Sequence, residues 1–368
     1  MRRCLLTLIV VSVAACTGTA GDAPLIPTTS RPTTTPSTTG PSPSTTSSIA
    51  AQTTISATTT TVPAALAPDD LVLESFPVPS GSGPHDVAPA LDGRVWYTAQ
   101  NTGELGLLDP DTGETTHIDL GSGSSPHGVI VDQAGTAWVT DSGLNAMVAV
   151  DPSDFAVEVY PLPDDRPGAN LNTAAIDGEG TIWFTGQSGV YGRLAPDAGD
   201  MSVFDAPEGR GPYGITSTPA GDVFYASLAG SFIGLVEDDD STTVLEPPTQ
   251  DQGARRVWSD SQGRIWVSEW NSGNLSRYTP DTGSWDTWHM PGDSPQTYAV
   301  YVDDLDIVWA SDFGSNSIAR FDPATEEFHT YPLPHNPGNV RQILGRPGEV
   351  WFPESAADSL VLVRTTRP

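Results

Sequence analysis

Apolar and polar residues alternate along most of the chain in short runs, and the same order of runs returns seven times. Each copy has an apolar strand start, a polar turn with Gly, a strand with one large aromatic residue, and two further alternating strands. The copies are spaced by 41 to 45 residues. Four strands at this period are typical of β-propellers, so we predict an all-β, seven-bladed β-propeller with four-stranded antiparallel blades. The marker aromatic residues are Trp96, Trp138, Trp183, Phe224, Trp266, Trp309 and Trp351.

The second repeat shows its four strands most clearly. Alternation predicts strands over 128–132, 136–141, 146–151 and 156–162, with polar turns between them. The last repeat ends with its third strand at 359–364, so its outer strand is missing. The segment from Leu71 to Val78 has the pattern of that strand. We therefore expect this N-terminal segment to complete the last blade, because closing the ring removes exposed strand edges.

The first residues follow a different pattern. Two arginines precede an apolar run from Leu5 to Val13, and small residues follow before Cys16, which is the layout of a secretory signal. The run is too short to span a membrane. Its end resembles a bacterial lipoprotein cleavage site, so we predict a signal peptide at 1–15 and a lipid on the Cys16 thiol. The mature protein would be exported and anchored to the outer face of the bacterial cytoplasmic membrane.

Residues 16–68 consist mainly of Thr, Ser, Pro and Ala with almost no charge. Such a segment cannot bury enough apolar surface to fold, so we predict a disordered tether that precedes the propeller at 69–368. At about 3 Å per residue in an extended conformation, the tether would reach on the order of 150 Å. Removal of the signal leaves Cys16 as the last cysteine, so we expect no internal disulfide.

The formal net charge of −30 narrows the choice of partners. An acidic field of this size repels nucleic acid and anionic lipid, so we expect no nucleic-acid partner and membrane contact only through the lipid anchor. All 16 basic residues are Arg, which excludes chemistry that needs a lysine amine. We expect a monomer that takes a small molecule or a cyclic peptide at one rim of the propeller.

That rim is predicted from strand direction. The first strand of each blade begins, and the second ends, on the same face of an antiparallel pair. Trp270 follows the end of one second strand and is placed to stack on a ligand. First-strand starts carry His85, His127, Asn172, Tyr213, Arg255, Tyr298 and Val340, and second-strand ends carry Ala99, Asp141, Gly186, Ser227, Glu269, Asp312 and Glu354.

A structural role competes with a functional one at each of these positions. Carboxylates at strand ends often accept hydrogen bonds from backbone N–H groups of the following turn. The two histidines follow Pro on neighbouring blades, and they either connect adjacent inner strands or belong to a site at the channel mouth.

The repeats GPHDV, SPHGVIVDQAGTAWVTD, GPYGITSTPAGDVFYAS and GRIWVSEWNSGNLSRY resemble those of the virginiamycin B lyase family, which inactivates streptogramin antibiotics. The resemblance spans all seven repeats. It implies a carbon–oxygen lyase that opens a cyclic depsipeptide ester by elimination. In that family a His base removes an α-proton, Mg²⁺ stabilises the developing enolate, and the carboxylate departs.

The family's catalytic positions match this chain only in part. They lie in the last two blades, where this chain has Tyr298, Val340, Gly338 and Glu354, and only the glutamate agrees. Rotation of the pattern by two blades gives a better match. His127 then takes the base position, His85 orients the substrate, and Asp141 and Ser125 occupy the metal positions. Ser125 is a poor ligand for Mg²⁺, so we predict a weak metal site or none.

Three functions remain open from the sequence. The first is a lyase of the streptogramin B type, with Glu269 and Glu354 as further metal candidates. The second is a non-catalytic surface module that binds a ligand or peptide. The third is a Ca²⁺-dependent lactone hydrolase, for which Asn172, Glu269 and Glu354 offer only scattered ligands.

Overall fold

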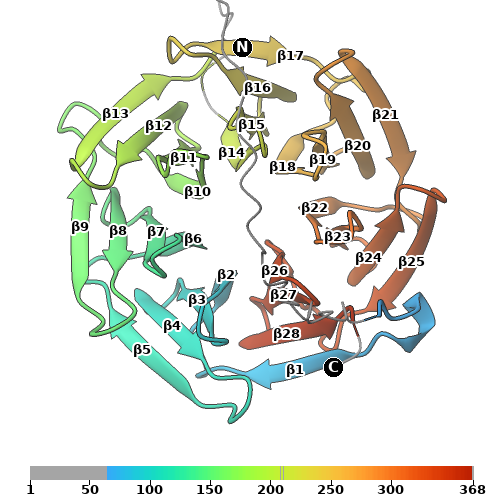
Figure 1. The fold of residues 1–368 in the computed structure, drawn as a ribbon, viewed down its shortest axis with the longest axis horizontal. Helices are drawn as coiled ribbons and strands as arrows, with labels where there is room; N and C mark the ends of the chain where they lie inside the picture. The colour runs from blue at the N-terminus through green and yellow to red at the C-terminus, as the bar shows by residue number, and fades with distance from the viewer. Residues whose placement is uncertain (1–63, 208, 210, 367–368) are drawn as a thin grey trace, which may run out of the picture. The chain divides into compact units, whose positions relative to one another are not determined.

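The computed structural model describes residues 64–207, 209 and 211–366, and the predicted signal, Cys16 and most of the predicted tether lie outside these residues. Seven four-stranded antiparallel sheets follow one another around a ring (Figure 1). This arrangement confirms the predicted seven-bladed β-propeller. In each blade the first strand lies at the central channel and the last at the outer wall.

The blades begin and end close to the sequence predictions. Blades one to three contain β2 (Pro84–Pro89), β3 (Val95–Ala99), β4 (Glu104–Leu108), β5 (Thr115–Asp119), β6 (Pro126–Val131), β7 (Ala137–Asp141), β8 (Ala146–Val150), β9 (Val157–Pro161), β10 (Leu171–Ile176), β11 (Ile182–Gly186), β12 (Val190–Ala195) and β13 (Asp200–Asp205). Blades four and five contain β14 (Pro212–Ser217), β15 (Val223–Ser227), β16 (Phe232–Val236), β17 (Thr242–Leu245), β18 (Ala254–Ser259), β19 (Ile265–Glu269), β20 (Asn274–Thr279) and β21 (Ser284–His289). Blade six contains β22 (Thr297–Val302), β23 (Val308–Asp312), β24 (Ser317–Asp322) and β25 (Glu327–Pro332).

The seventh blade is assembled from both ends of the propeller. Its strand order is β1-β28-β27-β26, so the N-terminal strand pairs antiparallel with the last strand of the chain. The Phe76 ring lies 5.5 Å from the Trp351 ring, which anchors β1 on the blade core. The predicted closure strand is thus confirmed. The elements are a short 3-10 helix (Pro68–Asp70), β1 (Leu73–Pro77), β26 (Leu344–Arg346), β27 (Glu349–Glu354) and β28 (Ser359–Arg364).

The marker aromatic residues form the core between the sheets, where each is nearly or fully buried. In four blades an Asp six residues earlier accepts a hydrogen bond from the Trp Nε1–H, as Asp132 does from Trp138 at 2.8 Å. The same carboxylate caps the intervening turn, so one residue fixes both the hairpin and the ring. Ala90 stands at this position in the first blade, and the buried Trp96 Nε1 has no partner there.

The inner strands share a bulge near their start. Between Pro84 and Val87 of β2, for example, two residues lie opposite one residue of β3, and five other inner strands shift register in the same way. Bulges turn side chains out of the regular alternation, and here they direct consecutive residues into the channel.

In five blades a hydroxyl on the second strand connects the bulge to the next blade. Thr98 Oγ1 accepts the Asp86 N–H at 3.0 Å and donates to the His127 carbonyl at 2.8 Å. Four further blades repeat this link through Thr140, Thr185, Ser268 and Ser311. The remaining blades have Ala226 and Pro353 at this position.

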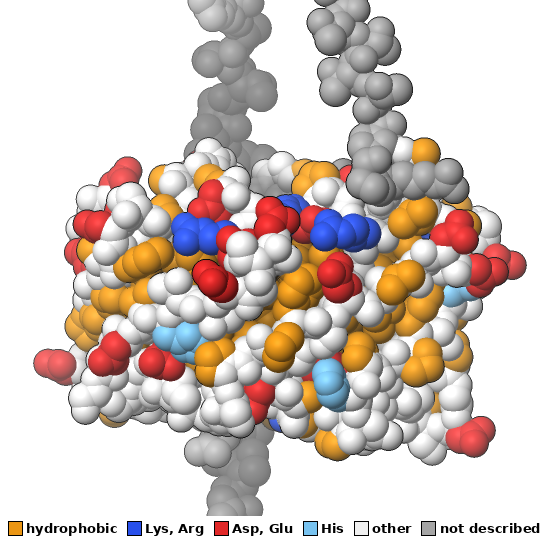
Figure 2. Space-filling view, turned by 90° about the horizontal axis from the view of Figure 1, so that it is seen from below, with side chains coloured by type: hydrophobic (Ala, Val, Ile, Leu, Met, Phe, Trp, Pro, Cys, Tyr) orange, Lys and Arg blue, Asp and Glu red, His pale blue; other side chains and the backbone are white. Residues whose placement is uncertain are grey.

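The outer wall is acidic and mixed in character. Figure 2 shows Asp and Glu side chains spread among apolar ones, with the Arg side chains gathered in one band. None of the helices that the structure describes is long and apolar enough to cross a membrane.

Candidate functional site

The channel end at which the inner strands begin is called the upper mouth here. The rings of His85 and His127 lie 3.8 Å apart, and Asn172 Nδ2 is 3.1 Å from His127 Nε2. On the other side the hydroxyls of Tyr213 and Tyr298 are hydrogen-bonded. The structure therefore brings together all seven residues that the sequence placed here as catalytic or substrate-binding: His85, His127, Asn172, Tyr213, Arg255, Tyr298 and Trp270.

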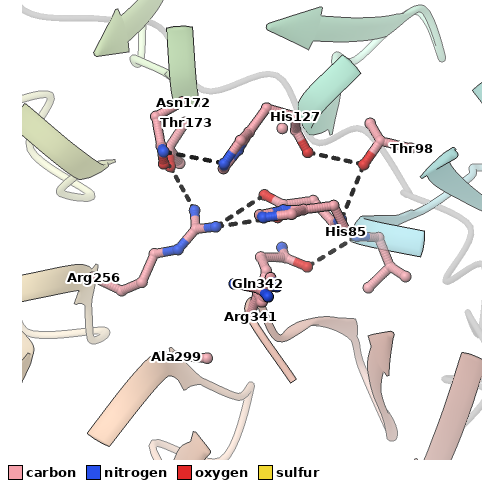
Figure 3. Close-up of polar contacts among 12 residues, drawn as sticks. His85, Thr98, His127, Asn172, Thr173, Arg256, Ala299, Arg341 and Gln342 are labelled. Carbon is pink, nitrogen blue, oxygen red and sulfur yellow. Dashed lines mark hydrogen bonds and ion pairs between the residues drawn. The ribbon is translucent and has the colours of Figure 1, made fainter. Parts of the chain in front are cut away.

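A hydrogen-bonded network that includes His85 crosses the channel (Figure 3). His85 Nδ1 lies 2.8 Å from Asp86 Oδ1, and the Arg256 guanidinium approaches the same carboxylate at 3.1 and 3.4 Å. Arg256 also donates to Thr173 Oγ1. Residues from the first, third and fifth blades are thereby joined, and His85, Asp86 and Arg256 among them are almost fully buried.

The Asp86 contact gives His85 a defined tautomer. An ionised carboxylate only accepts hydrogen bonds, so His85 Nδ1 donates its proton to Asp86. Its Nε2 then carries the lone pair and can take a proton from another molecule. This is the arrangement of an imidazole base held by an acidic partner.

His127 has a different environment. Its Nε2 faces the amide of Asn172, whereas its Nδ1 is buried and has no hydrogen-bond partner. A buried polar atom without a partner costs about 1–3 kcal/mol, which is tolerated at sites that receive a ligand or water. His127 is therefore suited to contacting a bound molecule beside His85.

Cationic and aromatic side chains close the rest of the upper mouth. The Arg255 guanidinium carbon lies 3.6 Å from the centre of the Tyr298 ring and 4.6 Å from that of Trp270. Arg341 lies 5.8 Å from the Tyr298 ring and is held by Ser355. Tyr298 is only 1 % exposed and His85 only 5 %, whereas Arg255 and Arg341 are half-buried at the edge of the site, so an entering ligand would meet these arginines before His85.

Burial and the arginine charges determine the protonation states. Burial, together with the charges of Arg256, Arg341 and Arg255, lowers the pKa of His85 well below its usual value. Burial and the neighbouring His85 lower the pKa of His127 in the same direction. Both rings are therefore neutral at pH 7. Burial raises the pKa of Asp86, and the Arg256 charge only partly offsets this effect.

Burial and the arginine charges shift the pKa values of Tyr213 and Tyr298 in opposite directions. Burial raises the pKa of Tyr213 to about 12. Burial also opposes ionisation of Tyr298, but the charges of Arg255, Arg256 and Arg341 outweigh it and lower the pKa of this phenol. Three arginines thus act on the buried rings of the upper mouth in a chain whose net charge is −30.

The predicted metal ligands lie elsewhere, at the turns that follow the second strands. Asp141 Oδ1 accepts the N–H groups of Ser125, Gly143 and Leu144 at 2.9 Å each, and Ser124, rather than Ser125, offers its hydroxyl. Here Asp141 acts as a turn acceptor, as the structural alternative predicted.

Glu269 and Glu354 are also hydrogen-bonded locally. Glu269 accepts from Ser272, Asn274 and Ser276, and Glu354 accepts from the backbone and ring of His335. The structure does not bring these carboxylates together with the histidines.

Among the described residues, one group of three side chains has metal-ligand spacing. Its members are His85, Asp86 and His127, whose ligand atoms all lie within 4.8 Å of one another. This set fits Mg²⁺ poorly, because Mg²⁺ prefers oxygen ligands and Asp86 is the one carboxylate. The Arg256 guanidinium already occupies that carboxylate, and Arg255 and Arg341 add further positive charge.

Sequence reasoning missed three charged members of the site. Asp86, Arg256 and Arg341 each follow a predicted mouth residue by one position, where regular alternation would point them away from the channel. The bulges of β2 and β18 turn Asp86 and Arg256 inward instead, and Arg341 lies ahead of β26, outside the described strands. The sequence did mark these three residues, because most other repeats have a small residue at this position, such as Gly128 and Gly214, rather than a charged one.

Comparison with known proteins agrees with this architecture. The sequence model of the virginiamycin B lyase family matches residues 120–367, more than half of the chain. A streptogramin B lyase structure has a TM-score of 0.74 at 22 % identity, covering 80 % of this chain and 97 % of that chain. The virginiamycin B lyase of Staphylococcus aureus gives 0.74 at 19 % identity, with 80 % and 99 % covered.

More distant propellers match as well. YCF48 bound to D1 peptide has a TM-score of 0.64 at 15 % identity, covering 80 % of this chain and 97 % of that chain. No curated protein matches the sequence. At these identities the structural similarities show the fold and leave the chemistry to the residues of the upper mouth.

Proposed function

Because the chain belongs to the virginiamycin B lyase family, we propose that its upper mouth catalyses the elimination of a carboxylate from an ester, with His85 as the base. The hydrogen bond of His85 Nδ1 to Asp86 Oδ1, at 2.8 Å, carries this proposal. The sequence assigned the base to His127. The acidic partner favours His85, and the His127 ring then lies beside the base, with ring centres 3.8 Å apart.

The reaction balances without a cofactor. His85 Nε2 takes the proton from the carbon next to a carbonyl group, and that electron pair forms a C=C bond to the neighbouring carbon. The C–O bond at this neighbour breaks, and the ester leaves as a carboxylate. The proton on His85 then passes to solvent, which restores the base.

The cationic residues supply the charge stabilisation. Negative charge develops on the carbonyl oxygen and on the leaving carboxylate, and Arg255 and Arg341 stand at the edge where these atoms would bind. Arg256 holds Asp86 in place and partly offsets the effect of burial on the pKa of this carboxyl. Guanidinium groups in a nearly dry site are strong stabilisers of such charge, which the family assigns to Mg²⁺.

The test is turnover of a cyclic depsipeptide ester of the streptogramin B type by the purified protein, followed by mass spectrometry. His85→Ala removes the base and should lower the rate by about 10²–10⁴. Asp86→Asn should also lower it, because the neutral amide no longer fixes the tautomer. The exposed His289 provides the matched control, and His289→Ala should keep full activity.

A chelator arm separates this mechanism from the metal-assisted one. Turnover should persist in EDTA. Activity that is lost in EDTA and restored by Mg²⁺ would refute the arginine mechanism, and an intact ester under both conditions would refute the lyase.

The second candidate is a non-catalytic module that binds an anionic ligand. The convergence of Arg255, Arg256 and Arg341 on one mouth of a strongly acidic protein favours it. Calorimetry with the cyclic ester and with its linear acid product decides between the two. Binding of the acid without turnover of the ester would support this module.

We also propose that the protein is exported and carries a lipid on Cys16, on the basis of the signal layout before it. Cys16→Ser should remove the protein from the membrane fraction. Cys4→Ser is the matched control, because Cys4 lies within the predicted signal, and it should leave fractionation unchanged. Membrane retention of the Cys16 variant would contradict the proposal.

A further inference from the structure

The opposite end of the channel, called the lower mouth here, contains a cavity of about 630 Å³. It lies where the inner strands end, and six of the seven blades line it. Cavities of roughly 300–1,000 Å³ are typical of small-molecule sites. Between the two mouths there is only a space of about 30 Å³, bounded by Asp86, Thr173, Arg256 and Gln342. The lower cavity is therefore separate from the proposed catalytic site.

Apolar side chains form most of the wall. Ile130, Ile176 and Leu344 remain partly exposed although they belong to inner strands, and they face this space. Trp258 and Tyr301 stand side by side with ring centres 5.0 Å apart and form an aromatic section of the wall. A partly exposed Trp in a concave apolar surface provides a stacking face for a ligand.

The charged side chains at the opening are mostly acidic, and most of them already have hydrogen-bond or ion-pair partners within the protein. Asp260 and Asp303 accept turn N–H groups and the indole N–H of a core Trp. Asp306 accepts both the N–H and the hydroxyl of Ser261. The single arginine, Arg346, is paired with Glu349.

Asp304 is the exception. It is exposed, and its carboxylate accepts one backbone N–H, that of Gly348, at 3.3 Å. The same turn position in the other repeats is Leu91, Gln133, Gly178, Pro219, Ser261 and Arg346, so the carboxylate is particular to the sixth blade. It lies on the blade that also contributes Tyr301, one blade from Trp258.

We propose that the lower mouth binds a small organic cation, an amine with an aromatic or aliphatic body. The apolar body packs against Ile130, Ile176 and Leu344, and the ammonium group lies between the Trp258 face and the Asp304 carboxylate. An ammonium over an indole and an exposed ion pair each contribute modestly. Together they favour the amine over a neutral molecule of similar shape by about three- to thirtyfold.

The experiment is calorimetry at low ionic strength with three probes of equal shape: phenethylamine, phenethyl alcohol and phenylacetate. The amine should bind most tightly and the carboxylate most weakly. Asp304→Asn should reduce the preference for the amine over the alcohol to the part that the Trp258 face supplies, whereas Asp111→Asn, at an exposed turn of the first blade, should keep the full preference. Equal binding of all three probes to the unmodified protein would overturn the assignment of a cation.

A second pair of variants tests the cavity itself. Val131→Trp fills the space from the end of β6 and should abolish binding of every probe, whereas Val157→Trp on the outer strand β9 should not. Thermal melting identifies a variant that fails to fold. Unchanged binding in a folded Val131→Trp protein would place the probes elsewhere and refute the site. Because these variants leave the upper mouth intact, ester turnover should be unaffected.

Discussion

The ion pair between Asp86 and Arg256 offers the most direct test of the channel architecture. Both side chains are almost fully buried, at 2 % and 4 % exposed, and they join the first and fifth blades. Arg256→Met keeps the length of the side chain but removes its charge. Asp86 is then left as an uncompensated buried carboxylate, which typically costs about 3–5 kcal/mol. Urea unfolding at pH 7.5 should show this loss of free energy.

The pH dependence identifies the cause of the loss. Burial already raises the pKa of Asp86, and removal of Arg256 raises it further because the favourable charge is gone. As the pH falls, Asp86 takes up a proton in the variant, so the deficit should shrink towards pH 5. Adding Asp86→Asn to Arg256→Met should likewise recover a large part of the stability. A loss below about 1 kcal/mol at pH 7.5, or a deficit independent of pH, would refute the reasoning.

Three further predictions concern stability. Ala90→Asp gives the unpaired Trp96 Nε1–H an acceptor and should raise the free energy of unfolding by about 1 kcal/mol, measured by urea titration; a decrease would contradict it. Deletion of 69–80 removes β1 and exposes the edge of β28, so it should lower the free energy of unfolding by at least about 3 kcal/mol and promote association. Thermal melting and light scattering measure these two effects. Deletion of 17–60 should cause neither. The free energy of unfolding should fall as the pH drops below 6.5, because His85 and His127 stay neutral in the folded state and take up protons on unfolding. Each histidine should contribute a slope of at most about 1.4 kcal/mol per pH unit. His289→Ala should leave the slope unchanged, and a free energy independent of pH would contradict the assignment.

The fold could be predicted because every repeat shows the same local sequence pattern. A polar turn, an aromatic residue at a constant interval and alternating strands must place Trp138 and its equivalents between sheets. The closure strand was predictable for a related reason, since a missing strand and a spare one are both visible in the sequence. Its bounds differ slightly, with β1 spanning Leu73–Pro77 within the predicted 71–78.

The site was predictable to the extent that it follows strand direction. His85, His127 and Arg255 come together because they occupy equivalent strand starts around the ring. Asp86 and Arg256 did not follow from alternation, because a bulge turns them inward and the hydroxyl of the neighbouring strand accepts the N–H group of each. Their pairing also joins blades far apart in sequence, 170 residues from each other.

The hydroxyl links between blades are not uniform, and this has a consequence for engineering the protein. Ala226 has no hydroxyl to offer Gly214 N–H or the Arg255 carbonyl, so the fourth and fifth blades meet without this connection. At the other interruption, Gln342 accepts the Val87 N–H at 2.9 Å and connects the seventh blade to the first. The hydroxyl link is thus missing at a junction far from β1 and β28, where apolar packing of Phe224 and Ile233 against Val257 and Val267 joins the blade cores. A circular permutant opened in the loop 246–253, with the native ends joined, would place its new termini at a junction that already lacks this link.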